Sequence, residues 1–266
     1  MSPDTKLSPA KKAIVGVQFL FVAFGATVLV PLLVGMDPST ALFVAGVGTL
    51  IFHLVTKGIV PIFLGSSFAF IAPIITATQL YGLSGTLSGL IGVALVYFIT
   101  SALVKWQDIK IIEKLFPPVV VGPVIILIGL SLAKTGVSMA ESNWIIALIS
   151  LITAVFVSIK AKGLLRLIPI FCGIIAGYIT ALLFFEVDLK PVRDAAWFSL
   201  PQFTFPEISW EPILFMIPVA IAPVIEHIGD VYVVNSVTGK NFIKSPGLHR
   251  TLFGDGLACL FAGIVG

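Results

Sequence analysis

The chain alternates between long apolar segments and short polar connections. Segments of about 20 apolar residues have the length that an α-helix needs to cross a hydrocarbon layer about 30 Å thick. On this criterion the sequence predicts about nine membrane-spanning helices, at residues 13–35, 38–56, 60–80, 84–104, 116–133, 142–160, 164–187, 211–235 and 248–266. The predicted fold class is therefore an all-α polytopic membrane protein.

Composition supports this prediction. Apolar residues (AVILMFWYC) make up 58% of the 266 residues and charged residues only 11%, whereas soluble domains average about 25% charged residues. So few charges cannot cover a water-facing surface, which excludes soluble enzymes, disordered chains and nucleic-acid-binding proteins. The two cysteines, Cys172 and Cys259, lie in apolar stretches without metal-ligand spacing. We therefore expect neither a metal site nor a cofactor.

The basic residues indicate an orientation in the membrane. Given these spans, 13 of the 16 Lys and Arg residues fall on the side of the tail at 1–12, and only three fall on the other side, Lys134, Lys190 and Arg193. Positive charge accumulates on the cytoplasmic side of membrane proteins. We therefore expect a cytoplasmic N-terminus, a location in the plasma (inner) membrane, a cytoplasmic surface helix at 105–115 and an irregular extracellular loop at 188–210.

Charged residues inside the eighth predicted span indicate a binding site. A charged side chain at this depth costs about 2.5–3.5 kcal/mol on insertion scales, yet Glu226, His227 and Asp230 lie there. Glu226 and Asp230 are four residues apart and share one helix face. Pro218 and Pro223 precede them and can kink or open the helix. Two carboxyl groups facing one cavity suit a polar ligand or an exchanging proton. The alternative is that these side chains only satisfy each other or nearby backbone groups.

The third predicted span is interrupted by Gly65, Ser66 and Ser67, followed by Phe68 and Phe70. This composition predicts a short extended stretch that leads into a half-helix. Irregular backbone at membrane depth is tolerated where it lines a cavity, and such breaks mark transporter binding sites. Free N–H groups near Phe68 could bind a planar heterocycle while the ring stacks on its face. The alternative is a small-residue notch for helix packing.

Enzyme motifs are missing from the sequence. It contains no HExxH, GxSxG or Walker lysine motif, so we expect a protein that is not an enzyme. Asp255 lies in the ninth predicted span after Arg250. We interpret it as a structural residue that pairs with Arg250 or with a neighbouring helix.

Several stretches, distributed over nearly the whole chain, carry a family resemblance: FGATVLVPLL at 24–33, residues 46–70 with LGSSFAF, FPP at 116–118, Gly122, EHIG at 226–229 and PGLHR at 246–250. On these motifs the chain resembles the uracil permeases of the nucleobase–cation symporter-2 family, the nucleobase/ascorbate transporters.

The resemblance implies a fold of fourteen membrane segments in two inverted seven-segment repeats. Residues 13–187 would form the first repeat, and residues 211–266 the first two segments of an incomplete second repeat, so we expect a C-terminally truncated chain. By similarity, Ser67, Phe68 and Glu226 bind the base, a second glutamate in span ten completes the site, and Glu226 and Asp230 couple transport to protons. A homodimer is also implied.

Asp230 is a departure from the family pattern. Uracil permeases often carry His at this position, whereas Asp is familiar from xanthine-type members, so the choice of substrate and the coupling scheme stay open. The expected function is proton-coupled import of a nucleobase, with uracil as the first candidate. A xanthine or other purine permease is the alternative within the family. A non-transporting membrane receptor or an intramembrane enzyme is the alternative of another class.

Overall fold

The computed structural model describes residues 27–107, 117–162, 165, 168–196 and 200–266. Most of the predicted first span lies outside these residues, and its described part, 27–34, is helical. The predicted surface helix at 105–115 falls mainly on residues outside the described part. Among the described residues, compact packing defines two units: a smaller unit within 130–200, and a larger unit within 27–129 and 201–266. The predicted division into repeats stays a prediction.

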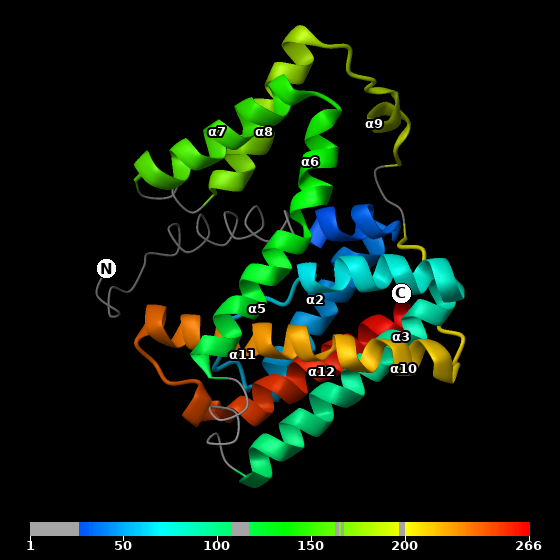
Figure 1. The fold of residues 1–266 in the computed structure, drawn as a ribbon, viewed down its shortest axis with the longest axis vertical. Coiled ribbons are helices and arrows are strands. Elements are labelled where there is room, and N and C mark those ends of the chain that lie inside the picture. The colour runs from blue at the N-terminus through cyan, green and yellow to red at the C-terminus, as the bar shows by residue number, and fades with distance from the viewer. Residues whose placement is uncertain (1–26, 108–116, 163–164, 166–167, 197–199) are drawn as a thin grey trace. The chain divides into compact units, whose positions relative to one another are not determined.

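The smaller unit is built on a helical hairpin. It contains α6 (Ala133–Glu141), α7 (Trp144–Lys160), α8 (Pro169–Phe184) and α9 (Lys190–Asp194). α7 and α8 pack side by side (Figure 1). A Cβ added at Gly173 would lie 2.7 Å from the carbonyl oxygen of Ser150, so this close approach requires glycine. α9 is a short helix within the stretch 188–210, which we predicted to be irregular throughout. The helical turn begins at Lys190, directly before Pro191, whose fixed φ favours the first turn of a helix.

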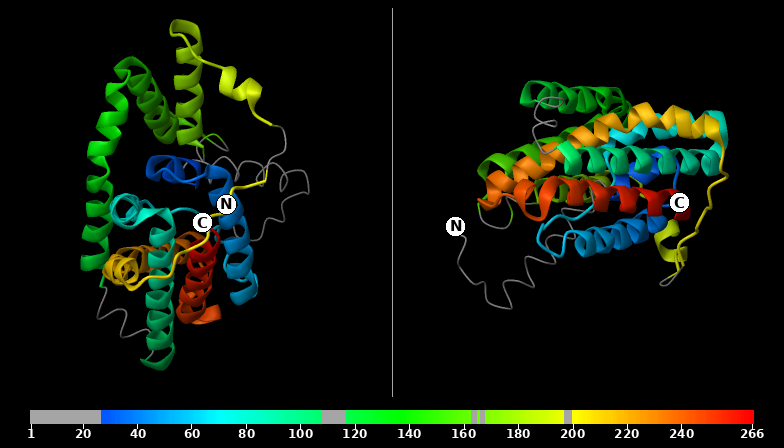
Figure 2. Two further views of the ribbon diagram at one scale, coloured as in Figure 1. Left: turned by 90° about the vertical axis from the view of Figure 1, so that its right-hand side faces the viewer. Right: turned by 90° about the horizontal axis from the view of Figure 1, so that it is seen from below.

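The larger unit contains α2 (Pro38–Val55), η1 (Phe68–Phe70), α3 (Ile71–Gln107), most of α5 (Pro118–Ser131), α10 (Trp210–Val219), α11 (Ile221–Thr238), η3 (Ile243–Gly247) and α12 (Leu248–Val265). In both views of Figure 2, α12 lies between α2 and α3. α3 also packs against α10. The largest fully buried side chains include Phe52, Leu87, Met216, Ile228 and Leu252, one each from α2, α3, α10, α11 and α12.

The break in the third predicted span is present. Residues 61–67 are not helical, and η1 then leads directly into α3. α3 itself is interrupted at Gly82, whose φ of 71° and ψ of 173° are not helical. Glycine adopts such a positive φ without steric cost. The chain turns sharply there, so the first part of α3 forms a half-helix and the second part a long helix (Figure 1).

The kink in the eighth predicted span is also present. α10 and α11 are bent by 41° relative to each other, and Pro218 lies inside α10 just before the bend. Proline removes a backbone donor and clashes with the preceding turn. The bend leaves Glu226, His227 and Asp230 together on α11.

Several described helices are long and apolar enough to cross a membrane. Four meet this criterion, Pro38–Val55, Phe68–Gln107, Gly122–Glu141 and Ile243–Val265, and the bent pair α10 and α11 makes a fifth. These helices make the chain a multi-pass membrane protein. The count of nine stays a prediction, because α7 and α8 have only 17 and 16 residues and the third and fourth predicted spans merge across Gly82.

The N-terminal end of α2 is hydrogen-bonded to the segment before α10. Asp37 caps α2 by accepting hydrogen bonds from the N–H groups of Ser39 and Thr40, each 3.1 Å long. The Thr40 hydroxyl, on a side chain that is buried, donates to the Gln202 carbonyl at 2.9 Å. Burial by itself raises the pKa of Asp37, but the bonds from Ser39, Thr40 and Gln202 outweigh it and hold that pKa below the usual value.

Candidate functional site

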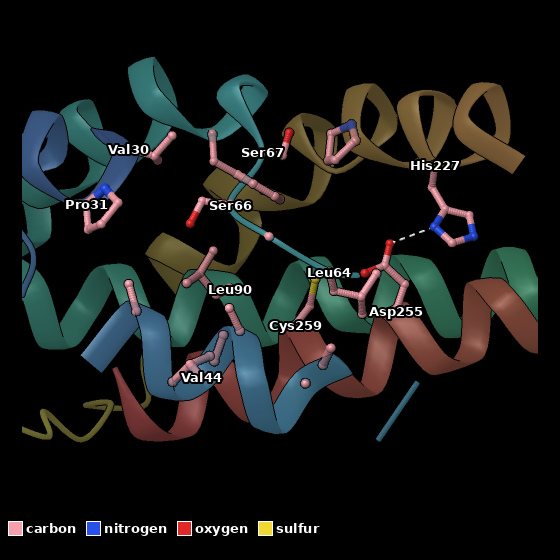
Figure 3. A pocket seen from close by; sticks show the side chains of 18 of the residues that line it. Val30, Pro31, Val44, Leu64, Ser66, Ser67, Leu90, His227, Asp255 and Cys259 are labelled. Atoms are coloured by element: carbon pink, nitrogen blue, oxygen red, sulfur yellow. Dashed lines mark ion pairs between the residues drawn. The ribbon is translucent and has the colours of Figure 1, made fainter. Parts of the chain in front are cut away.

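A cavity of about 420 Å³ lies within the larger unit. Its walls come from residues 30–36, α2, the extended segment 62–67, α3, α11 and α12. Val30, Pro31, Val44 and Leu90 lie toward one end of the cavity and His227 and Asp255 toward the other, with Ser66 and Ser67 between them (Figure 3). The polar lining residues are Ser66, Ser67, Tyr97, Glu226, His227, Asp230, Asp255 and Cys259. Its size is that of a small-molecule site, and its mixed lining is typical of one.

The structure brings Ser67 and Glu226 together in this cavity. Ser67 is the N-cap of η1, and its Oγ accepts a hydrogen bond from the Ala69 N–H at 3.2 Å. The same hydroxyl donates to Glu226 Oε2 at 2.5 Å across a separation of 159 residues in the sequence. The broken third span and the acidic eighth span therefore meet at one hydrogen bond. Glu226 lies beside the N-terminus of the half-helix, where free N–H groups favour an anion or an acceptor.

Phe68 and Phe70 have different positions relative to the cavity. Phe68 is the first residue of η1, and its backbone N–H lies at a helix start, where intrahelical acceptors are missing. Phe68 is not among the residues that line the cavity, whereas Phe70 is. Phe70 is thus the aromatic residue of η1 that borders the cavity, and the expected role of Phe68 stays a prediction.

Asp230 lines the same cavity one helical turn after Glu226. Its side chain is exposed to the cavity and forms no hydrogen bond with any residue that the structure describes. The two carboxyl groups thus lie on one helix face and line one cavity, as predicted. Glu226 is hydrogen-bonded to Ser67, whereas Asp230 is exposed.

The sequence interpretation missed a buried pair in the wall of this cavity. His227 Nδ1 lies 2.9 Å from Asp255 Oδ2, and the two side chains are 7% and 17% exposed (Figure 3). The rings of Tyr97 and Phe52 lie edge-on to the imidazole at 6.2 and 6.5 Å. Asp255 therefore pairs with a neighbouring helix and not with Arg250. His227 Nε2 is buried and finds no partner among the described residues.

Metal binding has no support in the described part of the chain, where no group of three or more His, Cys, Asp or Glu side chains is placed to hold an ion. The cavity combines carboxyl groups, a hydroxyl, a helix start and an apolar wall. Such a set can hydrogen-bond a polar, uncharged ligand and can take up a proton.

A polar cavity where an interrupted helix meets a kinked one, inside a multi-pass membrane protein, is typical of membrane transport proteins. Residues 10–266 match the Permease family, and the chain belongs to that family.

Curated relatives agree with this assignment. The chain is 51% identical to a probable uracil permease from Haemophilus influenzae, over 97% of this chain and 65% of that protein. It is 45% identical to a uracil permease from Bacillus caldolyticus (94% and 61%) and 36% identical to one from Escherichia coli (94% and 60%). The chain thus spans less than two thirds of the length of these relatives. All three are named permeases, in agreement with the prediction that the chain is not an enzyme.

Proposed function

We propose that the chain carries the substrate site of a nucleobase transporter, with uracil as substrate, and that transport is coupled to protons. The observation that carries this proposal is the hydrogen bond between Ser67 and Glu226 inside the cavity. The names of the relatives support uracil as the base.

The groups at the cavity match the hydrogen-bonding edge of a pyrimidine base. Such a base presents N–H donors and carbonyl acceptors in one plane. The carboxylate of Glu226 accepts from ring N–H groups, and the Ser67 hydroxyl holds that carboxylate in place through the hydrogen bond it donates to it. The backbone N–H of Phe68, next to Ser67 at the start of η1, donates to a carbonyl oxygen of the base. The Phe70 ring and the apolar wall cover the faces of the base. Because a carboxylate accepts hydrogen bonds and a carboxylic acid also donates one, protonation of Glu226 changes its fit to the base.

Asp230 provides a second carboxyl group in the same cavity. In the proposed cycle, Glu226 and Asp230 exchange the coupled proton with the solvent. We further propose the plasma membrane as the location, with the N-terminus in the cytoplasm, the inverted-repeat arrangement described above, and a homodimer as the assembly.

A purine such as xanthine is the second candidate substrate. The cavity of about 420 Å³ has room for a two-ring base, and Asp230 is the residue that the family resemblance associates with xanthine-type members. Competition experiments separate the two candidates: excess uracil should suppress the uptake of labelled uracil more strongly than excess xanthine does.

The test of the proposal is uptake of labelled uracil by proteoliposomes under an imposed pH gradient. We expect uptake that follows the gradient and that collapses when a protonophore is added. Glu226→Gln should abolish uptake, whereas Glu211→Gln, a change in an exposed acid at the start of α10, should leave it intact. Uptake that ignores the gradient would refute proton coupling, and uptake that survives Glu226→Gln would refute the role of this carboxylate.

A further inference from the structure

The extended segment that leads to Ser67 is hydrogen-bonded to α2 through the side chain of Thr49. Leu64 N–H donates to Thr49 Oγ1 at 3.0 Å, and Thr49 Oγ1 lies 3.3 Å from the Leu64 carbonyl oxygen. The same hydroxyl lies 2.7 Å from the carbonyl oxygen of Ala45, its own helical acceptor. Backbone groups at membrane depth need such partners, because lipid offers none. Thr49 supplies this partner where helical hydrogen bonds are missing.

The position of this contact matters for the site. Leu64 precedes Ser67 by three residues, and an extended chain advances about 3.3–3.6 Å per residue. The Ser67 hydroxyl that bonds Glu226 therefore lies only about 10 Å of extended chain or less from the fixed point at Leu64. Gly65, between them, passes so close to residue 27 that an added Cβ would lie 3.2 Å from Thr27 Oγ1. The segment is thus bound to Thr49 at Leu64 and has little free space beside Gly65, immediately before the site.

We propose that Thr49 is a positioning residue of the substrate site: its hydroxyl holds the backbone at Leu64 and thereby sets where Ser67 and the start of η1 meet Glu226. This inference rests on the proposed function for its binding readout. Thr49 is not among the residues that line the cavity, so it acts through the backbone and not by contact with the substrate.

Three variants test the proposal in the protein expressed from its complete reading frame. Thr49→Val keeps the shape of the side chain but removes the hydroxyl, and Thr49→Ser keeps the hydroxyl. Thr100→Val is the matched control, because Thr100 in α3 is also half-buried and also donates to the carbonyl four residues earlier, at 2.8 Å, but holds no extended segment.

Leaving one part-buried backbone donor unsatisfied costs about as much as a five- to thirty-fold change in an equilibrium. The segment escapes this cost when it shifts so that the Leu64 N–H finds another partner, and the base then binds only after the segment has returned to its original position. We therefore expect Thr49→Val to weaken equilibrium binding of labelled uracil by about five- to thirty-fold. Thr49→Ser and Thr100→Val should stay within about twofold of the unmodified protein. Unchanged binding by Thr49→Val would overturn the proposal, and so would equal losses in Thr49→Val and Thr100→Val.

A second readout does not depend on the ligand. Amide hydrogen exchange at Leu64 and Ala69 reports the two contacts directly, since their N–H groups bond to Thr49 and Ser67. We expect faster exchange at both amides in Thr49→Val and not in Thr100→Val. Faster exchange at Leu64 alone would show that the contact of Thr49 with Leu64 does not control the position of Ser67 and would overturn the proposal. Absence of uracil binding in the unmodified protein would instead refute the proposed function, while the exchange test still stands.

Discussion

The close contact between α3 and α10 predicts how strongly a substitution at Gly92 destabilises the protein. Gly92 in α3 faces Ile213 in α10. A Cβ at Gly92 would lie 3.0 Å from the Ile213 carbonyl oxygen, 3.1 Å from its Cγ2 and 3.3 Å from its Cα. Ordinary contacts between carbon atoms are about 3.5–4.0 Å long. Two of these three atoms belong to the backbone and cannot rotate away, so the two helices must separate to admit a methyl group.

Gly92→Ala should therefore destabilise the protein. Overpacking of this kind costs about 1–3 kcal/mol, and the better helix propensity of alanine returns up to about 1 kcal/mol. With the full propensity gain, a net loss of up to about 2 kcal/mol remains, which for a chain of this size lowers the melting temperature by up to about 8 °C. The assay is thermal melting of the purified protein in detergent micelles.

The matched control is Gly129→Ala in α5. A Cβ at Gly129 meets no atom within 4 Å, so only the propensity gain applies, and this variant should melt at or above the temperature of the unmodified protein. If Gly92→Ala melts as high as Gly129→Ala, then α3 and α10 do not pack as closely as described and the reasoning is refuted.

Two further predictions concern polar contacts. Asp37→Ala removes the N-cap of α2 and should lower the unfolding free energy by about 0.5–2 kcal/mol in melting experiments at neutral pH. The pKa of Asp37 is lower in the folded protein than in the unfolded chain. The contribution of its carboxylate to the unfolding free energy is therefore complete above the usual carboxyl pKa and is lost as the pH falls through the lowered value. The difference in unfolding free energy between Asp37→Ala and the unmodified protein should therefore shrink on acidification, and a difference that grows would contradict this. Asp255→Ala leaves His227 buried without its partner at 2.9 Å and should cost about 1–3 kcal/mol, whereas Asp255→Asn, which still accepts a hydrogen bond, should recover part of that loss. Equal melting of the two Asp255 variants would show that the pair does not stabilise the fold.

Local features of the chain could be predicted from the sequence. The break at Gly65 to Ser67 and the bend after Pro218 each follow from the properties of a few adjacent residues. The placement of Glu226 and Asp230 on one face follows from the helical period alone. These features needed no knowledge of how helices pack.

Contacts between distant segments could not be predicted in this way. The hydrogen bond from Ser67 to Glu226 joins residues 159 positions apart, and the pair of His227 with Asp255 depends on how α11 lies against α12. Neither leaves a periodic signal in the sequence. The same holds for the position of Phe70 at the cavity, which depends on how η1 lies against the other elements.

Equilibrium binding of labelled uracil to Glu226→Gln tests the central proposal, a base-binding site at Glu226, most directly. The amide keeps the shape of the side chain but replaces one acceptor oxygen by a donor. A hydrogen bond to a charged group contributes about 1.5–3 kcal/mol, so uracil should bind at least about tenfold more weakly to this variant, with Glu211→Gln unchanged. Affinity for uracil that is the same in Glu226→Gln as in the unmodified protein would contradict the account.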